Sequence, residues 1–220
     1  MTTPEPLHPH AIRWHYSAAE IWADGVVHVL GLVLAFGASL VLLLKLGGWD
    51  LPGLEIAAVG TYLATLLASL GISAVYNLWP VSRAKWILRR FDHSAIFLLI
   101  AGTYSPFMAR LEMWWMLGFV WLAAGLGVAF KLSAPGRFPR LSVLFYLALG
   151  WTGVFAYQTL GAELPALVLW LILGGGLAYS FGVVFHIADR MRFHNAVWHG
   201  FVLAGAGLHF GAVFALAMAA

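Results

Sequence analysis

The sequence contains no cysteine among its 220 residues and few charged side chains. Without cysteine there are no disulfides, thiolate nucleophiles or thiolate ligands, so any metal ion must be held by nitrogen and oxygen atoms. Charged residues make up 10% of the chain, whereas 62% of it is hydrophobic. A water-facing surface needs more polar groups than this, and a lipid-facing surface needs none. The composition therefore predicts a membrane protein.

Seven apolar stretches are long enough to cross a bilayer, which takes about 20 residues of helix. Polar or glycine- and proline-rich segments separate them, including Pro80 with the basic run to Arg90 and the segment 161–163. The predicted spans are Asp24–Leu46, Leu54–Leu78, Asp92–Arg110, Met113–Lys131, Leu141–Gln158, Leu164–His186 and Asn195–Met218. The sequence thus predicts an all-α integral membrane protein, a seven-transmembrane helical bundle.

A chain of this length has room for seven helices and short loops, and none for a separate soluble domain. We expect residues 1–20 to form a polar N-terminal tail and residues 21–220 to form one membrane domain. The tail lacks a basic segment that leads into an apolar run and a small-residue cleavage site, so we expect no cleavable signal peptide. The third and fourth spans are joined only through Leu111 and Glu112, which favours an antiparallel pair.

The basic residues are distributed asymmetrically between the two predicted ends of the bundle. If the spans alternate in direction, all but Lys45 and Arg110 lie on the side of the N-terminus. These residues are Arg13, Arg83, Lys85, Arg89, Arg90, Lys131, Arg137, Arg140, Arg190 and Arg192. The positive-inside rule then predicts a cytoplasmic N-terminus and an external C-terminus. The net charge of +3 follows from this asymmetry and gives no reason to expect a nucleic-acid partner.

Polar side chains gather at the predicted cytoplasmic ends of four spans. Within a membrane each ionisable group costs a few kcal/mol unless a partner, a metal or water satisfies it. The members of this polar cluster are Glu20, Asp24, His28, Ser73, Asn77, Asp92, His93, Asn195, His199 and His209. Several are four residues apart and so share a helix face, while His209 lies about 15 Å deeper than His199. We interpret the cluster as a functional site.

Each of these residues also has a structural interpretation. Glu20 and Asp24 suit a helix N-terminus, because the positive end of the helix macrodipole attracts their negative charge. Ser73 can hydrogen-bond a carbonyl of its own helix, Asp92 can act as an N-cap, and His209 can pack against a neighbouring helix. His199 is harder to explain in this way, because an inward histidine seldom lacks a partner and a neutral imidazole is a common zinc ligand.

Three segments of the chain resemble bacterial hemolysin III proteins: Ser73–Pro80, Arg90–Phe107 and Asn195–Phe210. Those proteins are similar to the adiponectin and progestin receptors and, more distantly, to alkaline ceramidases. The resemblance extends over essentially the whole chain from Glu20 onward. It implies seven spans in a bacterial inner membrane, membrane lipids as partners, and a zinc site near the cytoplasmic face.

The resemblance also implies a ligand set. In better understood members of the superfamily, a histidine four residues after a second-span serine and a His-x-x-x-His pair in the seventh span hold zinc, and a third-span aspartate orients the metal-bound water. The serine corresponds to Ser73, the aspartate to Asp92 and the last histidine to His199. The other two positions are Asn77 and Asn195, and amides bind zinc much more weakly than imidazole.

Three arrangements stay open: a weaker or rearranged metal site that draws in His28, His93 or Glu20, a metal-free hydrogen-bonded cluster, or a proton relay. The first functional hypothesis is a zinc-dependent hydrolase of lipid amides or esters at the cytoplasmic leaflet. In it, Asp92 takes up the water proton and Ser73 stabilises the oxyanion. The alternatives are a non-catalytic sensor or regulator of lipid composition or fluidity and, last, a pore-forming hemolysin, which should be soluble before it inserts.

Overall fold

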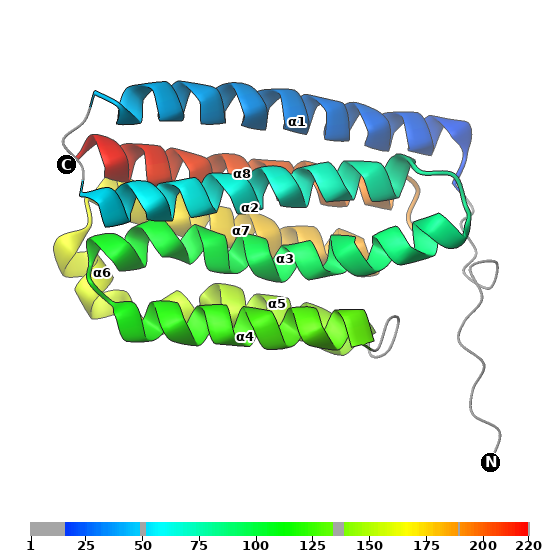
Figure 1. Cartoon of the computed structure of the whole chain (residues 1–220). Helices are drawn as coiled ribbons and strands as arrows, with labels where there is room; N and C mark the ends of the chain where they lie inside the picture. Colours follow the sequence, from blue (N-terminus) through cyan, green and yellow to red (C-terminus); the bar gives the residue numbers. More distant parts are fainter. Residues whose placement is uncertain (1–15, 49–51, 134–138, 189, 220) are drawn as a thin grey trace, which may run out of the picture.

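The computed structural model describes residues 16–48, 52–133, 139–188 and 190–219, and these are helical apart from their connecting turns (Figure 1). A short 3₁₀ segment, Trp151–Ala156, lies between α5 and α6. The α-helices are α1 (Ala18–Leu46), α2 (Gly53–Leu78), α3 (Arg83–Arg110), α4 (Trp114–Ser133), α5 (Pro139–Gly150), α6 (Tyr157–Glu163), α7 (Ala166–Ile187) and α8 (His194–Met218). The prediction of an all-helical fold is confirmed for this part of the chain.

Six helical segments are long and apolar enough to cross a membrane: α1, α2, α4, the run from Leu141 to Glu163, α7 and α8. Their outward faces carry large exposed apolar side chains, such as Phe36 and Leu44 on α1 and Leu126 on α4. Lipid tails cover such faces without cost. The chain is therefore a multi-pass membrane protein. The α3 helix is 28 residues long but carries more charged and polar residues than the other helices.

The α3 helix begins at Arg83, more than two turns before the predicted start at Asp92. The prediction that the basic run to Arg90 separates two spans was wrong, because these residues form the first turns of the helix. Ser82 is the N-cap, and its side chain accepts a hydrogen bond from the backbone N–H of Lys85 at 3.3 Å. Asp92 consequently lies inside the helix and is not its N-cap.

The fifth predicted span is interrupted in its middle by the 3₁₀ segment. Tyr104 of α3 inserts its hydroxyl there, donating to the carbonyl of Gly150 at 2.8 Å and accepting from the N–H of Gly153 at 2.7 Å. These bonds satisfy backbone groups that the change of helix type leaves free. The helix then continues to Glu163, so the prediction that 161–163 separates two spans was also wrong.

The turn between α3 and α4 is as tight as the sequence predicts. Glu112 adopts a left-handed conformation with φ of 52°. The N–H of Met113 donates to the carbonyl of Met108 at 2.9 Å, and the N–H of Glu112 donates to Ala109 at 3.2 Å. This pair of bonds is a Schellman motif, which reverses the chain. The two helices accordingly pack against each other, as predicted.

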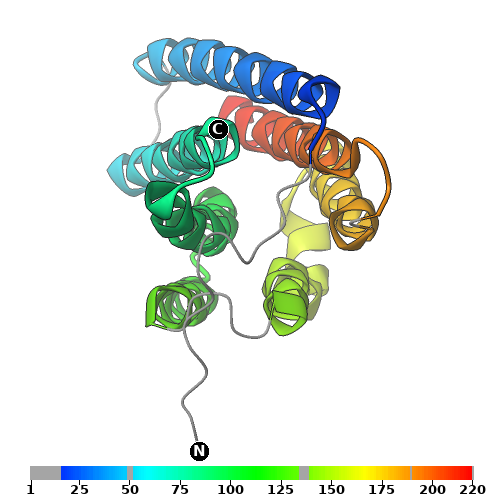
Figure 2. The same ribbon diagram turned by 90° about the vertical axis from the view of Figure 1, so that its right-hand side faces the viewer.

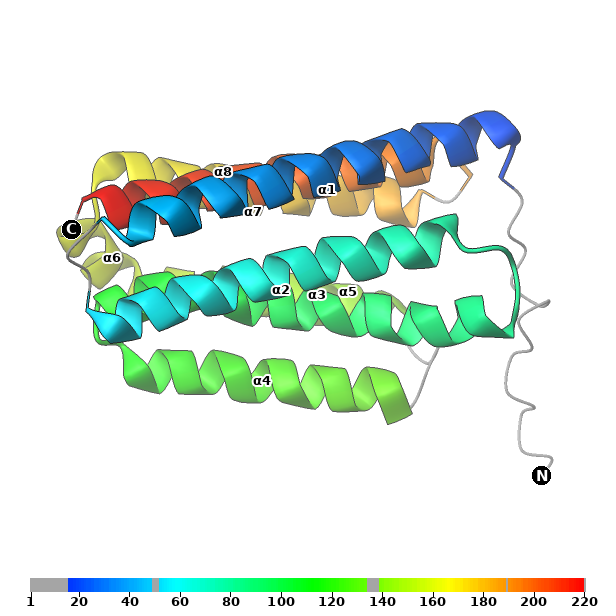
Figure 3. The same cartoon turned by 45° about the horizontal axis from the view of Figure 1, so that its top comes forward.

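The helices form a ring in chain order that α1 and α8 close. Each of α1, α2 and α3 packs against the next helix along the chain, α7 packs against α8, and α1 packs against α8 (Figure 2). The beginnings of α1 and α8 and the end of α2 therefore meet at one end of the bundle, at the right of Figure 1 and Figure 3. The prediction that the polar ends of these helices share one level is confirmed.

The apolar core fills the opposite end of the bundle. Its largest fully buried side chains include Leu42 near the end of α1, Leu66 of α2, Met108 near the end of α3 and Val213 of α8. Close packing there holds the helices together.

Candidate functional site

A cavity of about 370 Å³ lies inside the bundle and extends from the polar end to Tyr104 and His209. This volume falls in the range of small-molecule sites. It is lined by members of the predicted polar cluster together with apolar side chains. The cluster members that line it are His28, Ser73, Asn77, Asp92, His93, Asn195, His199 and His209. Asp92, His199, Ser73 and the two asparagines thus line one cavity, and the prediction that they meet in one functional cluster stays a prediction.

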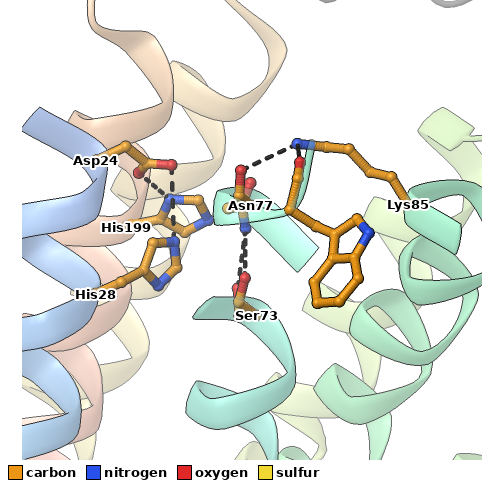
Figure 4. Close-up of polar contacts among 7 residues, drawn as sticks. Asp24, His28, Ser73, Asn77, Lys85 and His199 are labelled. Atoms are coloured by element: carbon orange, nitrogen blue, oxygen red, sulfur yellow. Dashed lines mark hydrogen bonds and ion pairs between the residues drawn. The ribbon is translucent and has the colours of Figure 1, made fainter. Parts of the chain in front are cut away.

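Asp24, His28 and His199 form a group that could hold a metal ion (Figure 4). One ligand atom from each lies within 4.8 Å of the others. Asp24 Oδ1 is 2.5 Å from His199 Nδ1, and Asp24 Oδ2 is 3.7 Å from His28 Nε2. All three side chains are nearly buried. Of the ligands that the family resemblance implied, this group contains only His199.

The local sequence explains why these three side chains meet. Asp24 and His28 are one turn apart on α1, so they share a face of that helix. The beginning of α1 packs against the beginning of α8, which carries His199. The rings of His28 and His199 lie 4.3 Å apart between centroids. The contact between α1 and α8 therefore forms the group, and the spacing of residues within one helix could not predict it.

The donor atoms of this group fit a divalent cation such as zinc. Two imidazoles and one carboxylate are a common set of protein ligands at catalytic zinc, which keeps a further position open. The buried His28 Nε2 has no hydrogen-bond partner among the described residues. At 3.7 Å it is too far from Asp24 for a hydrogen bond. A bound cation would satisfy this atom.

Ser73 and Asn77 lie across the cavity from this group, near the end of α2. The Asn77 side-chain amide donates to the Ser73 backbone carbonyl at 2.9 Å and to Ser73 Oγ at 3.3 Å. Since Oγ accepts this bond, its own proton stays free to donate elsewhere. Asp92 on α3 is close enough to Ser73 for their side chains to interact. Ser73 is therefore oriented as a hydrogen-bond donor.

Lys85 fixes the end of α2 from the first turn of α3. Its Nζ donates to the backbone carbonyls of Asn77 at 3.0 Å and Trp79 at 2.8 Å (Figure 4). The side chain is buried, although sequence analysis treated it only as a marker of orientation. By satisfying the last carbonyls of α2, Lys85 holds the turn that carries Asn77.

We expect Lys85→Met to lower the free energy of unfolding by about 1–3 kcal/mol, because two carbonyls lose a charge-assisted donor. Unfolding midpoints in detergent measure the effect. Lys45→Met is the matched control, because Lys45 is exposed at the other end of the bundle. Equal midpoints for the two variants would show that Lys85 does not hold α2.

Glu20 and His209 have structural roles. Glu20 completes a capping box with Ser17 at the start of α1, and its Oε1 accepts a hydrogen bond from the N–H of Phe193 at 3.1 Å. His209 Nε2 donates to the carbonyl of Ile172 on α7 at 3.1 Å. Gly175 makes room for that ring, since a Cβ there would clash with His209 Cδ2. These contacts agree with the structural interpretations of both residues.

Two cationic side chains that line the cavity were not predicted from the sequence. Arg89 of α3 and Lys131 of α4 both line it, and Lys131 is only 3% exposed. From the sequence, Lys131 contributed only to the predicted orientation, and Arg89 contributed to the orientation and as a cation able to neutralise Asp92. A lysine at the end of an apolar run looks the same in the sequence whether its side chain faces solvent or the interior of the bundle. The packing of neighbouring helices decides which it faces, and the sequence alone does not show that packing.

Comparisons with known proteins show the family to which the chain belongs. Residues 16–210 match the family model described as "Haemolysin-III related". The chain is 34% identical over 204 residues to the hemolysin-3 homolog of Bacillus subtilis, covering 89% of this chain and 93% of that protein. It is 32% identical over 196 residues to hemolysin-3 of Bacillus cereus, with 86% and 87% covered. It is 27% identical over 159 residues to the monocyte to macrophage differentiation factor of Homo sapiens, with 68% and 66% covered.

Proposed function

We propose that this chain, which belongs to the haemolysin-III related family, is a metal-dependent hydrolase that cleaves an amide or ester bond of a membrane lipid. The observation that carries the proposal is a shared cavity. His28 and His199 of the candidate metal group line the same space as Ser73 and Asp92. A metal group, a carboxylate outside that group and an oriented hydroxyl around one cavity are the parts that hydrolysis of a carbonyl compound needs.

We further propose that α3 is the seventh span and that the polar end of the bundle is cytoplasmic, in a bacterial inner membrane. The α3 helix lies among the other helices and is as long as they are (Figure 1). Apart from Asp92 and the C-terminal Arg110, its charged residues lie in its first turns: Arg83, Lys85, Arg89 and Arg90. Basic residues at that end are typical of the cytoplasmic side.

In this proposal Asp24, His28 and His199 hold the metal ion, which when bound polarises a carbonyl and lowers the pKa of water. Asp92 accepts the proton of the attacking water at its carboxylate. Ser73 donates its hydroxyl proton to the oxygen on which negative charge develops. Asn77 keeps that proton directed away from itself, because its amide occupies the acceptor side of Ser73 Oγ.

Lipid hydrolysis by purified protein tests the proposal. Protein loaded with zinc is incubated with a ceramide, which has an amide bond, and with phosphatidylglycerol, which has ester bonds. We expect fatty acid to be released from at least one of them, release to stop with a chelator, and release to return with zinc. Zinc-loaded, folded protein that releases fatty acid from neither lipid would overturn the hydrolase.

A second candidate function is a membrane sensor without catalysis. One observation favours it: Asp24 and His199 are already joined by a direct hydrogen bond at 2.5 Å, which gives each group a partner without a metal. The asparagines at two family ligand positions agree with it. For a sensor we expect Asp24→Asn to destabilise the bundle while the parent protein retains no metal and releases no fatty acid.

A further inference from the structure

Five basic side chains line one end of the cavity beside the candidate metal group. They come from four helices, and we call them the basic cluster: Arg89, His93, Lys131, His186 and His194. Arg89 and Lys131 are close enough to interact electrostatically. His93 also lies within the electrostatic reach of both. The fold thus gathers cations where burial makes isolated charge costly.

The described residues balance this charge only in part, because Asp92 lies within electrostatic reach of Arg89. Asp92 is the one carboxylate among the described residues that line the cavity. Asp24 is engaged by His199 and His28. No described carboxylate lies within ion-pair distance of Arg89 or Lys131. A buried cation is stable only beside a counter-charge or water, so a bound anion would stabilise this end of the cavity.

An independent observation indicates that a ligand belongs here. The Nδ1 atom of His194 is buried and has no hydrogen-bond partner among the described residues. His194 itself is 8% exposed and lines the cavity. Buried polar atoms in native proteins are almost always bonded. A group that accepts or donates hydrogen bonds at this end of the cavity would satisfy it.

The rest of the cavity suits an acyl chain. Away from the basic cluster its walls include the apolar side chains Leu70, Leu99, Leu147 and Leu203. Along α3 the lining extends from Arg89 to Tyr104, roughly 20 Å at 1.5 Å per residue. The hydrocarbon of one leaflet is about 15 Å thick. A lipid whose head lies at the basic cluster could therefore place its chain along the cavity.

From this arrangement we propose that the cavity binds an anionic phospholipid, with its phosphate held by Arg89 and Lys131 and its acyl chain along the apolar walls. Arginine and lysine together match the several oxygens of a phosphate. Basic pockets between membrane helices on the cytoplasmic side are known to bind such head groups. A zwitterionic lipid fits less well, because its own cation would meet the basic cluster. This inference names the lipid class on which the proposed hydrolase acts. Only the cleavage of the bound lipid rests on the proposed function; its binding does not.

Binding is measured on detergent-purified full-length protein with chelator present, so that neither a metal nor turnover contributes. Native mass spectrometry counts retained lipid with phosphatidylglycerol, phosphatidylcholine, oleate or inorganic phosphate as the probe. We expect phosphatidylglycerol to bind at least about tenfold more tightly than phosphatidylcholine, the difference that one charge-assisted contact supplies. Oleate and inorganic phosphate should compete weakly, since each carries only one half of the recognised structure.

Two variants assign the effect to the basic cluster. Lys131→Gln should weaken phosphatidylglycerol binding about tenfold, and Lys131→Arg should keep it. Lys45→Gln is the control, because it removes an exposed cation at the other end. Lipid-free Lys131→Gln should unfold at the same midpoint as the parent or higher, since it removes an unpaired buried charge. A lysine with a purely structural role would give a lower midpoint.

The inference is overturned if phosphatidylcholine binds as tightly as phosphatidylglycerol, if Lys131→Gln weakens binding no more than Lys45→Gln, or if oleate alone displaces the lipid. The last result would assign the site to carboxylates. Selective binding in a protein that releases no fatty acid would sustain this inference while the hydrolase fails. Hydrolysis without selectivity for the anionic lipid would do the reverse.

Discussion

Zinc affinity should fall at least about 100-fold when His199 is replaced by alanine, because changes even in the partners of metal ligands cost 10–100-fold. His199 supplies one imidazole of the candidate metal group and contacts Asp24 at 2.5 Å. Titration against a competing chelator measures the affinity. Fatty-acid release should fall to background in the same variant.

Removing His199 also leaves Asp24 buried without its partner, which by itself is destabilising. His28→Gln is the safer companion variant, because His28 Nε2 makes no hydrogen bond that folding would lose. It should lower zinc affinity by a similar factor with unchanged unfolding. Asn77→Ala and Asn195→Ala are the controls and should keep zinc affinity within a few-fold. An affinity that follows the two asparagines instead would place the metal at the family positions.

Asp92→Asn should lower fatty-acid release about 10²–10⁴-fold while zinc affinity stays unchanged, which is the usual contribution of a positioned general base. Asp92 lines the cavity but is not in the candidate metal group. The amide keeps the shape of the side chain and cannot accept the water proton. Initial rates of zinc-loaded protein measure the change.

Glu163→Gln is a suitable control for this variant, because Glu163 is an exposed carboxylate at the end of α6. If Asp92→Asn loses zinc together with activity, Asp92 is a ligand and the assignment of the metal group to α1 fails. If Asp92→Asn keeps full activity, the base is another residue. Measuring zinc affinity and turnover in the same variant thus distinguishes a metal ligand from a general base.

The sequence predicts the helices of this fold well because hydrophobic length is a strong signal for a span. It fails where tertiary contacts set the boundary. The first turns of α3 are basic, and the sequence signal for a span starts only at Asp92. The break between α5 and α6 depends on the Tyr104 hydroxyl, which comes from a helix far away in the sequence.

The site was predictable in its members and not in its pairings. Spacing of four residues identified Asp24 with His28 and Ser73 with Asn77, because such pairs share a helix face. That Asp24 pairs with His199 depends on the packing of α1 against α8, which spacing cannot show. The family resemblance implied that Asp92 is the carboxylate beside the metal. In the structure, Asp24 of α1 is the carboxylate that contacts His199.

The metal content of the purified protein tests the central claim most directly. Elemental analysis compares the parent protein with His28→Gln, both purified in detergent without chelator and shown to be folded. The account predicts close to one zinc ion per parent chain and a clear loss in the variant. A folded parent without metal, or equal metal in parent and variant, would contradict it.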